Sequence, residues 1–300
     1  MKGNKEMAGS EGRTRRDIEV ESVSGFISYV LRQKNIYDLF CYRGQACEAW
    51  RPEPSLHRQR TNADVERKSL TELVNEIPDE FQKDVTCFQR LMHSQHYGLP
   101  TRLLDVTMNP LVALFFACSD EEQKDQDGAV FVFDFKKVRI LNPDSDTLSI
   151  ICNLSGLSED EKNELEVLSN RYERNNSNNN WEEFNKNISC EKLVNLIRNE
   201  KIYFEKKIDP VCLLKYYFVS SLKSNNRIIA QSAAFIVSGF LKYNFPGDTT
   251  AFKMQKIIIP SDCKKRIIDE LSKLNITGMS MFPDIDHIAA YLKHKYQKKK

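Results

Sequence analysis

Hydrophobic and polar positions along the chain follow two periods, one typical of strands and one of helices. Apolar runs and period-two alternation predict strands at 38–45, 101–107, 128–135, 227–238 and 253–259. Helical spacing and capping residues predict helices at 22–35, 63–77, 79–97, 111–118, 191–203, 261–274 and 284–296. The class that follows is α+β, with a mixed central sheet.

The segment 111–118 differs from the other predicted helices because it is apolar on every side. Asn109 and Pro110 provide a cap residue and a first-turn proline just before it. A helix without a polar face has to be covered all round. We therefore expect one buried helix in the centre of the fold.

The region 142–226 has a more polar, helical character. Ser158 and Glu161 have the spacing of a capping box, and a polar low-complexity turn follows at 175–180. We interpret this region as a helical insertion within one domain that spans 18–296, and its apolar segment 211–222 is either a buried helix or a strand. The basic ends, 1–17 and 297–300, are expected to be a flexible leader and a short tail.

Composition excludes several classes of protein. The net charge is +2 and no run of about 18 apolar residues occurs, so neither a membrane span nor a secretory signal is expected. Eight cysteines lack C-x-x-C spacing, which favours reduced, buried thiols in the cytoplasm over disulfides or a metal site. P-loop, G-x-G-x-x-G, H-E-x-x-H and G-x-S-x-G motifs are all missing.

The first candidate for chemistry is Arg43, at the end of a hydrophobic strand and followed by Gly44. A guanidinium donates two parallel hydrogen bonds to a phosphate or carboxylate, and glycine lets a ligand or another backbone approach closely. The alternative is structural, with Arg43 paired to a buried acid such as Asp105. The strand alone favours neither.

The second candidate is the block 95–118, which places polar side chains just before the buried helix. Strand alternation puts Asp105 and Thr107 on one face and Arg102 on the other. The N-terminus of the following helix could receive an anion. Alternatively, Asp105 or Thr107 bonds the turn locally, and His96, at a helix end beside Tyr97, is a satisfied structural histidine.

The third candidate is Gln231, an amide in a predicted strand that is otherwise mostly apolar. A polar amide in such a strand needs hydrogen-bond partners. It either lines a site or joins neighbouring strands.

These residues carry a resemblance to a known family. The sequences YRGQ at 42–45, QHYGLPTRLLDVT at 95–107 and NPLVALFFAC at 109–118 resemble the FRG domain, with Tyr42 in place of the phenylalanine that gives the family its name. RIIAQSAAF at 227–235 and FPDID at 282–286 are similar to its C-terminal elements. Such domains occur in bacteria and phages near defence loci, which implies a toxin or an antiphage component.

A more distant resemblance is to ADP-ribosyltransferases of the Arg-Ser-Glu type. It implies an ADP-ribosyltransferase-like fold and NAD as substrate, with a protein or nucleic acid as acceptor and no metal. Arg43 would hold the diphosphate, and Gln231 stands where that family has its glutamate. On this basis the cofactor-binding residues are Arg43, Gly44, Thr107, Tyr97 and Arg102, and the catalytic residues are Asp105, Gln231 and His96. The alternative is a non-catalytic module that binds a nucleotide or nucleic acid.

Overall fold

The computed structural model describes residues 18–34, 37–58, 64–175, 181–222, 225–241, 243 and 252–296. Its strands form one mixed eight-stranded sheet in the order β1-β8-β4-β2-β3-β7-β6-β5. The central pairings are antiparallel, and both outermost pairings are parallel. The strands are β1 (Ile18–Glu19), β2 (Leu39–Gln45), β3 (Leu104–Thr107), β4 (Gly128–Phe135), β5 (Ile140–Leu141), β6 (Tyr216–Ser220), β7 (Ala233–Ser238) and β8 (Phe252–Ile259).

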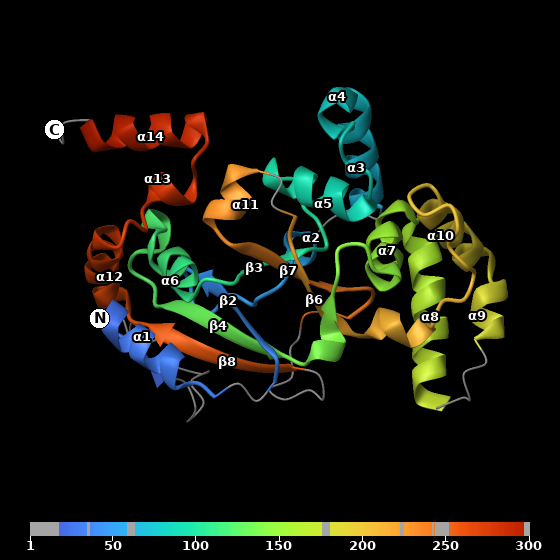
Figure 1. The fold of residues 1–300 in the computed structure, drawn as a ribbon, viewed down its shortest axis with the longest axis horizontal. Helices are drawn as coiled ribbons and strands as arrows, with labels where there is room; N and C mark the ends of the chain where they lie inside the picture. The colour runs from blue at the N-terminus through green and yellow to red at the C-terminus, as the bar shows by residue number, and fades with distance from the viewer. Residues whose placement is uncertain are drawn as a thin grey trace, which may run out of the picture.

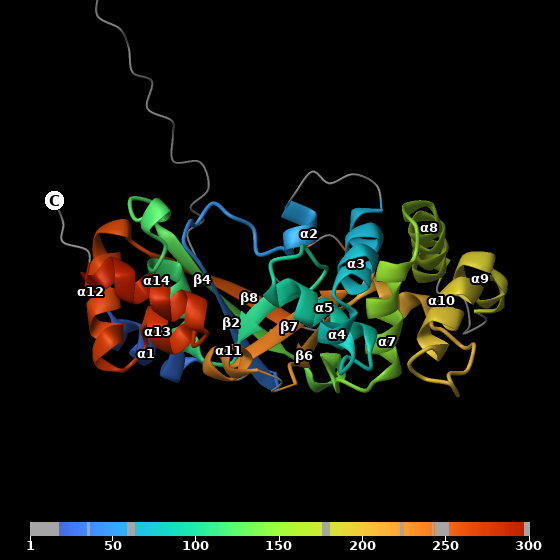
Figure 2. The same cartoon turned by 90° about the horizontal axis from the view of Figure 1, so that it is seen from above.

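Helices cover the sheet and extend beyond both of its ends (Figures 1 and 2). From the N-terminus they are α1 (Val23–Arg32), α2 (Ser55–Arg58), α3 (Val65–Glu76), α4 (Pro78–Phe81), α5 (Cys87–His96), α6 (Pro110–Cys118) and α7 (Asp146–Asn153). The later ones are α8 (Glu159–Asn175), α9 (Glu182–Lys186), α10 (Ile188–Arg198), α11 (Asn226–Ala230), α12 (Ser261–Lys273), α13 (Gly278–Met281) and α14 (Ile285–Tyr296). The α+β class and the mixed sheet are thus confirmed.

The sheet curls strongly along its length. Tyr216 of β6 and Phe252 of β8 are far apart in the strand order, yet their ring centroids lie 5.6 Å apart. Phe135 of β4 likewise reaches Phe218 of β6, at 6.2 Å. The concave face therefore closes on its own aromatic core, and the helices pack on the outer face.

Helix α6 is the buried helix that the sequence predicts. It begins after Asn109, whose Oδ1 accepts from the Leu111 amide, and it lies against β2 and β4 (Figure 1). A Cβ at Gly44 would stand 1.8 Å from the Ala113 carbonyl oxygen, and one at Gly128 would stand 2.4 Å from that of Ala117. Both strands need glycine because the helix backbone passes so close to them.

The structure corrects three sequence-based predictions. The helix expected at 79–97 is two helices, because Thr86 and Gln89 form a capping box that starts α5. The segment 227–238 is not one strand: it begins as helix α11, capped by Asn225, and only Ala233–Ser238 joins the sheet. The region 142–226 is not a helical insertion apart from the sheet: its segment 211–222, left open between helix and strand, contributes strand β6. The expected leader at 1–17 and tail at 297–300 lie outside the described residues.

All eight cysteines are free and buried, so the expected burial of these residues is confirmed. Within the described ranges, no helix is long and apolar enough to cross a bilayer.

Candidate functional site

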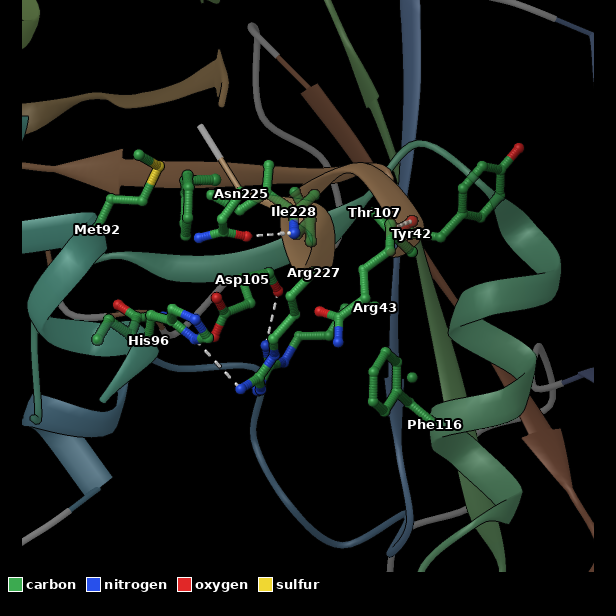
Figure 3. A pocket seen from close by; sticks show the side chains of 16 residues that line it. Tyr42, Arg43, Met92, His96, Asp105, Thr107, Phe116, Asn225, Arg227 and Ile228 are labelled. Atoms are coloured by element: carbon green, nitrogen blue, oxygen red, sulfur yellow. Dashed lines mark hydrogen bonds between the residues drawn. The ribbon is translucent and has the colours of Figure 1, made fainter. Parts of the chain in front are cut away.

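A cavity of about 270 Å³ opens where β2 and β3 diverge, between the sheet and helices α5, α6 and α11 (Figure 3). Its walls are mixed, with cationic, acidic, amide and apolar side chains. The lining residues are Tyr42, Arg43, Gly44, Met92, Gln95, His96, Asp105, Val106, Thr107, Phe116, Asn225, Arg227, Ile228, Gln231, Ala233 and Phe235. Asp105 is the sole acid in this set.

The divergence of the two strands is visible in their register. β2 pairs with β3 only at Tyr42 and Thr107, although continued antiparallel pairing would place Gly44 opposite Asp105. Instead, the side chain of Arg43 enters the gap, and its Nη1 donates to the main-chain carbonyl of Asp105 at 2.6 Å. A guanidinium therefore replaces a backbone ladder bond, which leaves a charged group at the cavity wall.

Arg43 keeps hydrogen-bonding capacity at this position. Its Nε is buried, and no partner for it is found among the described residues. Burial lowers the pKa of Arg43 to about 10, against the opposing effect of the Asp105 charge, so the side chain stays cationic at neutral pH. A partly buried cation with an unused N–H group is suited to bind an anion.

His96 and Arg227 meet in the same cavity (Figure 3). Nη1 of Arg227 lies 3.4 Å from Nδ1 of His96. Since arginine can only donate, Nδ1 accepts and the imidazole proton resides on Nε2. Burial, followed by the charge of Arg227, lowers the pKa of His96 below its ordinary value, so the ring is neutral at pH 7.

Thr107 and Gln231 both line the cavity but are engaged in structural hydrogen bonds. The Thr107 hydroxyl donates to the Gln231 carbonyl at 2.6 Å and accepts from the Asn109 amide at 3.0 Å. The Gln231 side chain donates to the Met281 carbonyl at 3.0 Å. Gln231 caps the end of α11 and is not a strand residue, which corrects the sequence-based placement.

The tertiary structure brings six of the predicted site residues into one cavity: Arg43, Gly44, His96, Asp105, Thr107 and Gln231. Strand alternation predicts that Asp105 and Thr107 share a face of β3. Both residues line the cavity, and so do their cross-strand neighbours Phe235 and Ala233. Gly44 makes close approach possible for helix α6, so its main contact is another backbone.

Two predicted residues lie elsewhere. Tyr97 is 60% exposed and stacks on the His96 ring beside the cavity. Arg102 is 5% exposed and forms a two-pronged ion pair with the buried Glu66. Arg102 therefore satisfies a buried acid and does not line the cavity.

Sequence reasoning did not select the lining residues Met92, Phe116, Arg227 and Ile228, which lie on helices, or Asn225, which caps α11. Arg227 was placed on a strand, where its direction toward the cavity could not be inferred. The Asn225 cap, with its side chain accepting from the Ile228 amide, was the local signal for a helix there.

The fold and site together define an α+β domain with a cation-bearing polar cavity at a split in its sheet. Residues 38–126, which run from β2 past α6, match the family model of the FRG domain, so the chain contains an FRG domain. No curated protein and no solved structure matches the chain. The matched segment supplies Arg43, His96 and Asp105, whereas Arg227 and Gln231 lie outside it.

Proposed function

We propose that the cavity binds NAD and that the protein is an ADP-ribosyltransferase-like enzyme acting on a protein or nucleic-acid acceptor. The observation that carries this proposal is the cationic Arg43, with its buried and unused Nε, beside Asp105 in one cavity of an FRG domain. Arginine supplies the planar donor pair that a diphosphate requires. Asp105 supplies the negative charge that the reaction requires.

In the proposed reaction, the bond between the ribose C1″ and the nicotinamide nitrogen breaks, and both bonding electrons leave with nicotinamide. The ribosyl group becomes cationic, and the Asp105 carboxylate offsets that charge. An acceptor O–H or N–H group then forms the new bond to C1″ and loses its proton to solvent. NAD and the acceptor thus give nicotinamide, ADP-ribosylated acceptor and one proton.

We give the role of offsetting the ribosyl cation to the Asp105 carboxylate and not to Gln231. A carboxamide carries no negative charge, and the Gln231 amide already donates to Met281. The cavity, at about 270 Å³, lies just below the usual range of roughly 300–1,000 Å³ for small-molecule sites. It therefore suits one half of the dinucleotide, with the rest of the ligand in the cavity mouth.

The direct test is to incubate the purified protein with adenylate-labelled NAD and cell extract. We expect free nicotinamide, labelled macromolecules and a rise in the protein's melting temperature with NAD. Digestion of the labelled material with protease or with nuclease identifies the acceptor class. If no nicotinamide is released and NAD gives no thermal shift, the proposal is wrong.

One intermediate outcome supports the alternative function. If NAD raises the melting temperature but no nicotinamide is released, the domain is a non-catalytic nucleotide-binding module. Gln231, which the resemblance aligns with the transferases' glutamate, is an uncharged amide that donates to Met281, and this observation favours the alternative. A toxin or antiphage role stays a prediction, to be tested by growth arrest on expression of the wild type and not of Asp105→Asn.

A further inference from the structure

Arg227 is held over the cavity by an aromatic ring from a distant part of the chain. Its guanidinium carbon lies 4.9 Å from the ring centroid of Phe282, which directly follows α13. Phe282 in turn meets Phe116 of α6 edge-on, at 5.9 Å. An arginine over an aromatic face is held in position and keeps its edge N–H groups available.

A hydrogen-bonded chain fixes the position of that ring. Thr107 of β3 donates to the Gln231 carbonyl, and the Gln231 side chain donates to the carbonyl of Met281, the residue before Phe282. Helix α13 is itself fixed by a capping box between Thr277 and Ser280. The segment 277–282 is therefore tied to the strand that carries Asp105.

Arg227 has donors left for a ligand. The hydrogen bond found for its side chain within the described ranges is the one from Nη1 to His96. Arg43 reaches the same cavity from β2, on the sheet side, while Arg227 reaches it from α11. Two cations and one carboxylate, that of Asp105, line this small cavity, so its charge is net positive and favours an anionic ligand.

We infer that Arg43 and Arg227 together bind a diphosphate group, and that Phe282 is the positioning residue that holds Arg227 in place for it. The ligand class is a diphosphate ester, and the segment 277–282, outside the family match, completes the site. This inference rests on the cavity of the proposed function but does not require cleavage of NAD.

A double-mutant cycle with inorganic pyrophosphate as the probe tests the inference. Binding is measured by titration calorimetry for the wild type, Arg227→Ala, Phe282→Leu and the double variant. We expect Arg227→Ala to weaken binding about tenfold or more. Phe282→Leu should weaken it about threefold to tenfold, and the double variant should bind no more weakly than Arg227→Ala alone.

Matched controls separate this effect from general damage. Phe240→Leu removes a partly buried ring that does not line the cavity, and Arg32→Ala removes an exposed arginine of α1. Both should bind pyrophosphate as the wild type does, and circular dichroism should show all variants folded.

Two results would overturn the inference: no binding of pyrophosphate by the wild type, or equal weakening by Phe282→Leu with and without Arg227. The first result would show that the cavity is not a diphosphate site, and the second would show that Phe282 does not act through Arg227. Since pyrophosphate carries no nicotinamide bond, its binding is measured independently of NAD cleavage, and a protein that binds pyrophosphate but never cleaves NAD refutes the transferase alone.

Discussion

Arg102 and Glu66 form a buried, two-pronged ion pair in which Nε meets Oε1 at 2.8 Å and Nη2 meets Oε2 at 2.5 Å. Glu66 lies on α3 and Arg102 lies two residues before β3 begins, so the pair joins the outer helices to the strand that carries Asp105. Nη1 of Arg102 also points to the Ile151 carbonyl of α7, at 3.3 Å. The position of the cavity wall therefore depends on a charge pair outside the cavity.

Breaking that pair should destabilise the fold and change its response to acid. Burial alone would raise the pKa of the Glu66 carboxyl, but the charge and hydrogen bonds of Arg102 outweigh burial and lower it. The stability that Glu66 contributes is thus complete above about pH 4.3, its pKa in the unfolded chain, and is lost as the pH falls through the lower folded-state pKa.

Glu66→Gln should therefore cost about 3–5 kcal/mol at pH 7, because it leaves Arg102 charged and buried without its partner. Urea denaturation at pH 7 and at pH 3 measures both quantities. The variant should lose less stability between these two pH values than the wild type. An identical acid dependence of the two proteins would show that Glu66 does not titrate with folding.

Arg43→Lys should weaken NAD binding and also lower the stability of the fold, and the two effects can be measured independently. Lysine keeps the charge but loses the planar fork that can bond the Asp105 carbonyl and a phosphate together. We expect NAD affinity to fall about tenfold or more, with a loss of stability of about 1–3 kcal/mol. Calorimetric titration and thermal melting measure the two effects. Arg32→Lys on exposed α1 is the matched control and should alter neither.

Asp105→Asn should slow the cleavage of NAD strongly and leave the binding of NAD nearly unchanged. The isosteric amide keeps the shape of the cavity wall but carries no charge to offset the ribosyl cation. Nicotinamide release should fall about 10²–10³-fold while the NAD dissociation constant changes little. Asp146→Asn, an exposed acid of α7 paired with Lys201, provides the control. Unchanged release from Asp105→Asn would assign the acid role to another residue.

Gly44→Ala should prevent normal packing of α6 on β2. The added Cβ would lie 1.8 Å from the Ala113 carbonyl oxygen, a main-chain atom that cannot move without displacing the helix. The expected cost is about 3 kcal/mol or more in denaturant unfolding. Gly25→Ala in α1, where the nearest atom is the Ser22 hydroxyl at 3.2 Å, should stay within about 1 kcal/mol. Equal costs at the two sites would contradict this account.

Local sequence determined much of the fold and part of the cavity. The apolar run at 128–135 is strand β4, and the Asn109–Pro110 start is the start of α6. These predictions succeed because periodicity and capping act within a few residues. Alternation on β3 likewise placed Asp105 and Thr107 on the cavity side, since successive side chains on a strand alternate between its faces.

The tertiary structure decided which charges pair and which remain available. Arg43 and Arg102 are the same type of residue, yet Arg102 pairs with Glu66 in the core and Arg43 enters the gap between two strands. Arg227 reaches the cavity because helix α11 precedes β7 and because Phe282, 55 positions away, lies beneath its guanidinium. Such partners come together only when the sheet curls and the C-terminal helices pack, and no local pattern encodes that long-range contact.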